Sequence, residues 1–417
     1  MKRTLIAAVF TLILALVFCA AGLAEGEILW LGGVGMKAGD YLASGANATT
    51  TTRPDDNYAH LSSDGKTLTL HNYSYAGSGY QYNVVYGIPY LSLLYTTHPL
   101  TLQLDENTSN SLVFSGTDGI NTKSIYLDGS AADLTITGSG SLNVKNGLYL
   151  IAANGSDVSI NGGSVTLETT VPSSYGIWLV GSDGDFALGE GALLKINTRS
   201  YGILTTGSTD INGGTLNIEN GFTGIDARSD LTISGGAVTV KNGGTGLQTD
   251  GNATISGGTV DITGKGYGIS AGGLAAISGG TIKMDNSAGT QHAIAGYGVD
   301  ITGGVLDLTS RLSAVRSINK PITCTLAMPD GAAILSDVGA TSYYYLDFTA
   351  NYENSDHTLR TISLPYVPAA PSAPAAPSAP ADVPTTGDSA PLAAWFALAA
   401  LSAACGVWLV VSCRRAL

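Results

Sequence analysis

Aromatic side chains at a repeated position are the residues in this sequence best suited to binding a ligand. Tyr175, Tyr201, Tyr267 and His292 each stand directly before Gly-Ile or a related pair, and Trp178 lies just beyond one of these landmarks. Sugar rings present C–H faces that pack on tyrosine and tryptophan rings. The spacing therefore predicts a ligand-binding column. The alternative is a structural column, in which the tyrosines pack at a corner of the core and only their hydroxyls reach water.

Acidic residues at equivalent positions of the repeat could act in pairs, as they do in glycosidases. Asp261 and Asp307 lie two repeats apart, about 9.6 Å at ~4.8 Å per repeat, which is the upper limit for an inverting glycosidase. Lys283 lies between them, and an alternating ladder of acid, lysine and acid is a cross-strand charge stack. The sequence contains no Cys-x-x-Cys, His-Glu-x-x-His, Gly-x-Ser-x-Gly or phosphate-loop motif. It predicts no catalytic residue.

The composition disfavours an ordinary helical enzyme and polyanionic partners. The chain has 417 residues, of which 55 are glycine, and only 12% are charged, against about 25% in a typical soluble domain. Its formal net charge is -13, and a field of this sign repels the phosphates of nucleic acid. We therefore expect a neutral or cationic partner and no nucleic acid.

A short phrase of isoleucine, a small polar residue and two glycines recurs through the middle of the chain. Its copies begin at Ile160, Ile211, Ile233, Ile255, Ile277 and Ile301. From the second copy onward the steps are 22, 22, 22 and 24 residues. After each Gly-Gly comes a stretch of period two, such as Val260 and Ile262, with apolar side chains on one face. The sequence is therefore a run of short strands separated by glycine corners.

This repeat predicts an all-β fold. A 22-residue unit of short strands cannot bury its own apolar face, so each unit must stack on its neighbours. We predict a right-handed parallel β-helix, or solenoid, over residues 99–328. The ends of such a stack are open sheet edges that need caps. Residues 25–98 are predicted to form a β-rich N-terminal cap, and residues 329–366 a C-terminal cap.

Residues 1–24 have the layout of a secretory signal peptide. Lys2 and Arg3 form a short basic start, an almost unbroken apolar run follows, and small residues surround Leu23 before Glu25. An N-terminal membrane anchor is the alternative. If both this segment and the residues after Thr386 are removed, Cys324 is the single cysteine of the mature chain, so we expect no internal disulfide.

The C-terminal segment combines a stalk with a membrane-targeting pattern. Residues 367–382 carry a proline at every third position or nearby, which favours an extended polyproline II stalk. Residues 392–411 are uncharged and just long enough to span a bilayer, and Arg414 and Arg415 follow. Between stalk and span lie Val383, Pro384, Thr385, Thr386 and Gly387.

This order of pentapeptide, apolar span and basic tail resembles the cell-wall sorting signal of Gram-positive surface proteins, whose usual motif is Leu-Pro-x-Thr-Gly. The resemblance implies that a sortase cleaves after Thr386 and joins its acyl group to peptidoglycan. Val383 stands where the family has leucine. The alternative is that the chain stays uncleaved as a single-pass protein of the cell membrane.

The repeats between about residues 100 and 320 resemble the clostridial carbohydrate-binding β-solenoid domains of cell-surface proteins. The likeness rests on coils such as Gly224-Ile225, Asp230-Leu231-Thr232-Ile233 and Gly235-Gly236. In that family an Asp-Asp pair before Gly-Ile is associated with calcium and acidic polysaccharides. Here only Asp118 keeps one acid at that place, so we expect no metal and no cofactor.

We therefore expect a non-catalytic, wall-anchored module that binds neutral polysaccharide or a host or cell-surface glycan, with sortase and peptidoglycan as further partners. A protein-binding adhesin is the first alternative, because it needs only the same long polar face. An enzyme of the polysaccharide lyase or hydrolase type is the second. Such an enzyme would need clustered Asp, His, Arg or Lys on adjacent coils.

Overall fold

The computed structural model describes residues 26–115, 121–219, 221–337, 341–348 and 360–365. Every regular element in these ranges is a β-strand, and they contain no helix that could span a membrane. The predicted signal peptide (residues 1–24), stalk (367–382), sorting signal (383–417) and the acid Asp118 lie outside the described residues.

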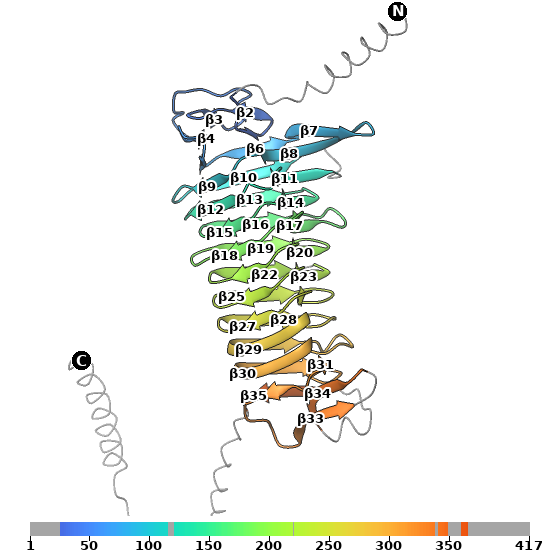
Figure 1. Ribbon diagram of the computed structural model, residues 1–417. Coiled ribbons are helices and arrows are strands. Elements are labelled where there is room, and N and C mark those ends of the chain that lie inside the picture. Colours follow the sequence, from blue (N-terminus) through green and yellow to red (C-terminus); the bar gives the residue numbers. More distant parts are fainter. Residues whose placement is uncertain (1–25, 116–120, 220, 338–340, 349–359, 366–417) are drawn as a thin grey trace, which may run out of the picture. The chain divides into compact units, whose positions relative to one another are not determined.

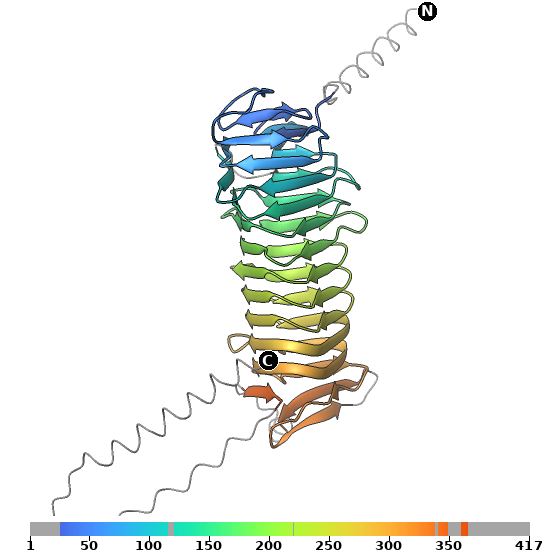
Figure 2. The same cartoon turned by 90° about the vertical axis from the view of Figure 1, so that its left-hand side faces the viewer.

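The strands stack into a parallel β-solenoid of about eight turns, which confirms the all-β solenoid part of the predicted fold class. Most turns contribute one strand to each of three parallel ladders, here called sheets A, B and C. The turns follow one another along a single axis (Figures 1 and 2). The N-terminal strands lie at one end of this stack and the strands that follow residue 331 lie at the other (Figure 1).

Sheet A contains β5 (Thr67–His71), β9 (Leu100–Leu104), β12 (Leu134–Gly138), β15 (Val158–Ile160), β18 (Phe186–Leu188), β21 (Thr209–Ile211), β24 (Leu231–Ile233), β27 (Ala253–Ile255) and β32 (Thr323–Cys324). Sheet B contains β6 (Ser74–Gly77), β10 (Ser109–Phe114), β13 (Ser141–Lys145), β16 (Ser164–Glu168), β19 (Leu193–Asn197), β22 (Thr215–Glu219), β25 (Ala237–Lys241), β28 (Thr259–Thr263) and β35 (Arg360–Leu364).

Sheet C contains β8 (Ile88–Thr96), β11 (Thr122–Leu127), β14 (Tyr149–Asn154), β17 (Tyr175–Val180), β20 (Tyr201–Thr205), β23 (Thr223–Ala227), β26 (Leu247–Thr249), β31 (Val315–Ile318) and β34 (Tyr343–Phe348). Two long strands, β29 (Ile269–Asp285) and β30 (Ile294–Ser310), turn corners and take part in all three sheets. The remaining strands are β1 (Leu29–Leu31), β2 (Val34–Met36), β3 (Tyr41–Ala43), β4 (Tyr58–Leu61), β7 (Tyr80–Val85) and β33 (Ala332–Asp337).

The core is a set of apolar columns, because equivalent residues of successive coils lie opposite one another. On sheet B, Leu216, Val238, Val260, Ile282 and Leu306 pair in register and are at most 1% exposed. A column of this kind removes nearly all of its methyl groups from water, which supplies the main driving force for stacking. The predicted inward positions of the repeat are confirmed.

The second glycine of each Gly-Gly pair is required at its corner. Gly258 has a φ of +75°, and a Cβ added there would lie 2.7 Å from the carbonyl oxygens of Gly235 and Gly236 in the preceding coil. A side chain would therefore strain the backbone and separate two coils at once. This is why the phrase recurs at the length of one coil.

Polar side chains at the corner before sheet A tie consecutive coils together. A carboxylate oxygen of Asp133 accepts the backbone N–H of Asp157 at 3.0 Å, and Asp157 accepts that of Asp185 at 2.9 Å. Asn252 does the same for Leu274 at 2.9 Å. These bonds satisfy N–H groups that the corner would otherwise leave without a partner.

The parallel stack begins earlier than the repeat suggests. Strands β5, β6 and β8 pair in parallel with β9, β10 and β11, although residues 25–98 were expected to form only a cap. Parallel pairing needs strands whose residues alternate between inward and outward positions, but it does not need the Gly-Gly phrase. The parallel stack therefore extends beyond the residues in which that phrase recurs. Antiparallel strands close the two ends: β1 pairs with β8, β34 with β31, and β35 with β30.

The carboxylates at the corner before sheet A lead to a first prediction. Burial, together with the carboxylates of Asp185, Asp133 and Asp183, raises the pKa of Asp157 above its ordinary value. A raised carboxyl pKa means that ionisation at neutral pH costs folding stability, and that this cost disappears once the group is protonated. Asp157→Asn should therefore raise the melting temperature at pH 7 by about 2 °C, because an amide accepts the same hydrogen bond at Asn252.

The gain should vanish as the pH falls below about 4, where the native carboxyl is protonated in both states. Asp330→Asn, which alters an exposed carboxylate elsewhere, is the control and should leave the melting temperature unchanged. A variant less stable than the native chain at pH 7 would show that the ladder requires the charge.

Candidate functional site

The outer face of sheet C carries one column of aromatic rings headed by a lysine. Lys123, Tyr149, Tyr175 and Tyr201 pair with one another in register on β11, β14, β17 and β20. The ring centroids of Tyr149 and Tyr175 are 5.2 Å apart, and so are those of Tyr175 and Tyr201, with planes inclined by 20° and 4°. The rings therefore stack along the axis of the solenoid, one per coil.

A second column runs beside the first. Tyr95, Tyr126, Ala152 and Trp178 pair in register on β8, β11, β14 and β17. Because Ala152 has no bulky side chain, the Trp178 ring reaches across the gap to Tyr149, with centroids 4.5 Å apart. The two columns therefore form one continuous aromatic surface.

A hairpin extends this surface beyond the first coil. β7 and β8 pair antiparallel, and Tyr82 of β7 stacks on Tyr95 at 5.4 Å and lies 4.9 Å from Tyr126. We call the whole set the aromatic strip; it contains Tyr82, Tyr95, Tyr126, Tyr149, Tyr175, Trp178 and Tyr201. All of its members are half-buried except Tyr126, which is buried.

One carboxylate organises the hydroxyls at the head of the strip. Asp128 accepts hydrogen bonds from the hydroxyls of Tyr95 and Tyr126, each at 2.9 Å. Burial, reinforced by Asp128, raises the pKa of both phenols above the ordinary range. Both rings therefore stay neutral at physiological pH and offer apolar edges with fixed polar tips.

The predicted column divides into two separate clusters. Thr223 follows Tyr201 in register, so the aromatic stacking ends there. Further along, Tyr267 and His292 lie 6.3 Å apart, and Arg316 lies over the Tyr267 ring at 5.7 Å. The structure thus brings Tyr175, Trp178 and Tyr201 together in the strip and leaves Tyr267 and His292 outside it.

His292 has little surface to offer a ligand. Its side chain is buried, with 6% exposure, and its Nδ1 lies 3.0 Å from the carbonyl oxygen of Ser313 and 2.8 Å from the Ser313 hydroxyl. Tyr345 of the closing strand β34 lies 6.1 Å from the imidazole. The geometry around His292 is that of a core residue near the end of the stack.

The sequence pattern missed two members of the first column, Tyr149 and Lys123. Both lack the Gly-Ile landmark, because Leu150 and Ser124 stand where other coils have glycine. The isoleucine two residues further on, Ile151 or Ile125, is retained in both coils. A search for any residue at that spacing before isoleucine would have found them.

A polar groove of about 460 Å³ lies on the outer face of sheet B. It is lined by Thr166, Glu168, Lys195, Ile196, Asn197, Asn217, Glu219, Thr239 and Lys241. Two carboxylates and two ammonium groups balance its charge, and Glu168 is already paired with Lys145 at 2.8 Å. The groove offers hydrogen-bonding groups but no aromatic ring.

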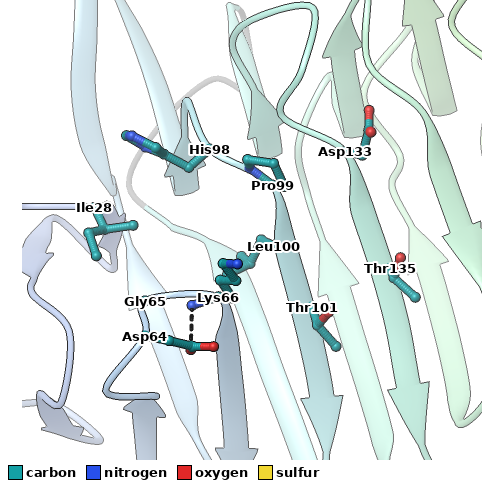
Figure 3. Close-up of a pocket in the computed structure, with 10 residues that line it drawn as sticks. All are labelled: Ile28, Asp64, Gly65, Lys66, His98, Pro99, Leu100, Thr101, Asp133 and Thr135. Carbon is teal, nitrogen blue, oxygen red and sulfur yellow. Dashed lines mark hydrogen bonds between the residues drawn. The ribbon is translucent and has the colours of Figure 1, made fainter.

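A second pocket, of about 450 Å³, lies beside the first turns of sheet A (Figure 3). Asp64, Lys66, His98 and Asp133 are its ionisable residues. The Asp64 carboxylate accepts the backbone N–H of Lys66 at 3.1 Å and the Ser62 hydroxyl at 2.6 Å, so it is engaged in its own turn. This pocket is more simply a feature of the turn than a binding site.

The acidic pair that the sequence singled out lies on sheet B, whereas the strip lies on sheet C. Asp261, Lys283 and Asp307 pair in register as expected for a charge ladder. Asp226, below the strip on sheet C, is 1% exposed and bonds to Arg228 at 3.0 Å. In the same ranges, no three His, Cys, Asp or Glu side chains gather as metal ligands would.

Comparison with known proteins connects this fold with carbohydrate. A family model described as "carbohydrate-binding domain-containing protein" matches residues 94–288 and 179–355, which together cover more than half of the chain. No curated protein and no solved structure matches.

The buried imidazole generates a second prediction. Burial lowers the pKa of His292 to about 4, and Arg316 acts in the same direction. The folded state then keeps a neutral imidazole, while the unfolded state takes up a proton below about pH 6.5. Stability should therefore fall by about 3 kcal/mol between pH 6.5 and pH 4 on account of this residue.

Urea unfolding of the native chain and of His292→Gln at these two pH values isolates the effect. The variant should lose less stability on acidification than the native chain does. Equal losses in both proteins would contradict the proposed burial of a neutral imidazole.

Proposed function

Because the chain belongs to the family of carbohydrate-binding domain-containing proteins, we propose that it is a non-catalytic module that binds neutral polysaccharide along the aromatic strip. The observation that carries this proposal is the in-register run of Tyr149, Tyr175 and Tyr201 on one rigid face, with Trp178 in the column beside it. A glycan that follows this face meets a new ring edge about every 5 Å. Such a surface recognises an extended chain better than a single sugar.

The stacking geometry determines which atoms a glycan can reach. Tyr175 lies between two parallel rings, so its faces are covered and its edge and hydroxyl are what remain for a ligand. Trp178 belongs to the neighbouring column, and its plane is inclined by 59° to that of Tyr175. We therefore assign the main apolar contact to Trp178 and the hydrogen bonds to the tyrosine hydroxyls.

Charge favours a neutral ligand. The chain carries a net charge of -13, which repels a polyanionic glycan over distances of about a Debye length. Lys123 and Asp128, one charge of each sign, lie beside Tyr126 at the head of the strip. The buried position of Asp226 keeps that carboxyl from a bound sugar, which supports binding without turnover.

We further propose that the module is exported and joined to the cell wall of a Gram-positive bacterium. The support is the order of the N-terminal apolar run, the residues Val383 to Gly387, the apolar run of residues 392–411 and the terminal arginines. In this proposal the partners are a sortase and peptidoglycan, and the stalk of residues 367–382 holds the binding face away from the wall.

The hairpin of β7 and β8 favours one second candidate, a protein-binding adhesin. At its tip Val84, Val85, Tyr86 and Ile88 are 50%, 37%, 100% and 51% exposed. Contiguous exposed apolar side chains on a soluble protein often mark a contact with another protein. The adhesin function becomes the stronger candidate if the strip does not bind glycan.

The proposed glycan contact is tested by truncating rings of the strip. Trp178→Ala and Tyr201→Ala should each weaken retention on soluble neutral polysaccharide about tenfold, or roughly 1.4 kcal/mol. The first removes apolar contact with the sugar, and the second removes a hydroxyl that hydrogen-bonds to it. Affinity electrophoresis with mixed-linkage β-glucan and galactomannan measures the effect. Tyr297→Ala, which removes an exposed ring outside the strip, is the matched control and should bind like the native chain.

The melting temperature of each variant separates a binding role from a structural one. If Tyr201→Ala lowers the melting temperature strongly and leaves retention unaltered, the tyrosines form a structural column, and the adhesin candidate takes precedence.

Wall anchoring has its own test. Mass spectrometry of enzymatically released wall fragments should find Thr386 joined to a peptidoglycan peptide. Recovery of the intact segment from Val383 to Leu417 in the membrane fraction would instead identify a single-pass membrane protein.

A further inference from the structure

Lys123 occupies the place in the first column that tyrosine occupies in the next three coils. It pairs in register with Tyr149, and its Nζ lies 3.4 Å from the ring centroid of Tyr126. The same nitrogen lies 5.5 Å from the centroid of Tyr82 and 5.7 Å from that of Trp178. Three rings from three different coils therefore surround one ammonium group.

This ammonium is held by aromatic rings and not by a carboxylate. In the described part of the chain, no acid lies within ion-pair distance of Lys123. Both oxygens of the nearby Asp128 accept hydrogen bonds from Tyr95 and Tyr126. A cation–π contact is an attraction to a ring face, so the N–H donors of the ammonium that do not point at a ring remain for an oxygen acceptor. The half-buried Lys123 can therefore donate to a ligand on the strip.

A second polar group at the same place lacks a partner. The Tyr82 hydroxyl is buried and makes no hydrogen bond within the described residues. A buried hydroxyl without a partner costs free energy that a bound oxygen atom would recover. Tyr82 therefore adds an unsatisfied donor beside Lys123, and a ligand reaches this hydroxyl by displacing the side chains that cover it.

We propose that Lys123 and the Tyr82 hydroxyl form the polar subsite of the strip, where they hydrogen-bond the hydroxyl and ring oxygens of one sugar unit of a neutral glycan. This inference rests on the proposed function and adds the groups that fix the orientation of the chain. The apolar face of that sugar unit packs on Trp178, and the glycan extends from there along Tyr149, Tyr175 and Tyr201.

The subsite should depend on pH in a simple way. The titratable groups that face Lys123 are Asp128 and Tyr126 of β11, Tyr82 of β7, Tyr95 of β8 and Tyr149 of β14. Burial raises the pKa of all four phenols above the ordinary value, so they stay neutral through pH 9.5.

Lys123 is different, because burial lowers its pKa to about 8, against the opposing pull of Asp128. The ammonium is therefore present below pH 8 and is lost above it. Since a charged donor makes a stronger hydrogen bond than a neutral amine, glycan binding should weaken as the pH rises through 8.

The test uses the purified full chain and surface plasmon resonance on immobilised mixed-linkage β-glucan and galactomannan. At pH 6.5, Lys123→Met should raise Kd about tenfold, and Tyr82→Phe, which removes only the hydroxyl, about threefold. Native Kd should rise about tenfold between pH 6.5 and pH 9.5. Lys123→Arg keeps its charge at both values, so its Kd should be nearly independent of pH.

Lys195→Met is the matched control, because it makes the same change on the outer face of sheet B. Its Kd should follow the native profile. Melting temperatures near that of the native chain confirm that each variant is folded.

The outcomes separate this inference from the proposed function. If the native chain binds and both Lys123→Met and Tyr82→Phe bind equally well with a flat pH profile, the polar subsite is wrong and the strip remains the binding surface. If the native chain binds neither polysaccharide at any pH, the proposed function is wrong, and the proposed subsite is wrong as well.

Discussion

Backbone pairing between coils is the constraint on which the rest of this structure depends. Each strand forms its parallel ladder with strands one coil away, so a residue must lie directly above its equivalent in the next coil. An apolar residue that faces inward then continues a buried column, as Val238 and Val260 do. At the corners the same register leaves no room for a Cβ atom, so glycine is required there, as at Gly258.

The same constraint acts on the outer faces, where residues spaced one coil apart in the sequence lie next to one another on the surface. Tyr149, Tyr175 and Tyr201 stack only because their coils are in register, and no loop has to hold them in place. The strip is therefore as rigid as the sheet beneath it, and a bound glycan would not need to order flexible side chains first. The ladder of Asp261, Lys283 and Asp307 on sheet B follows from the same register.

Much of the fold could be predicted from the sequence, because the period of a strict repeat shows which residues lie opposite one another in neighbouring coils. The inward residues, the glycine corners and the parallel stacking all follow from the phrase that recurs after Ile211. The start of the stack could not be predicted, since β5 and β6 pair by backbone alone and lack the phrase.

The candidate site was predicted only in part. The spacing placed Tyr175 and Tyr201 in one column. It missed Tyr149 and Lys123, because the residue after each is not the glycine of the Gly-Ile pair. It also grouped His292 with them, because burial of that ring depends on Tyr345 of β34, a strand distant in sequence.

The central claim is that glycan lies against the rings of sheet C, and Trp178 reports on this contact directly. Its tryptophan emission can be isolated as the difference between the native chain and a Trp178→Phe variant during titration with mixed-linkage β-glucan or galactomannan. We expect a saturable blue shift of this difference spectrum, because a sugar face displaces water from the half-buried indole. Saturable glycan binding seen by calorimetry, with the Trp178 emission unchanged, would contradict it.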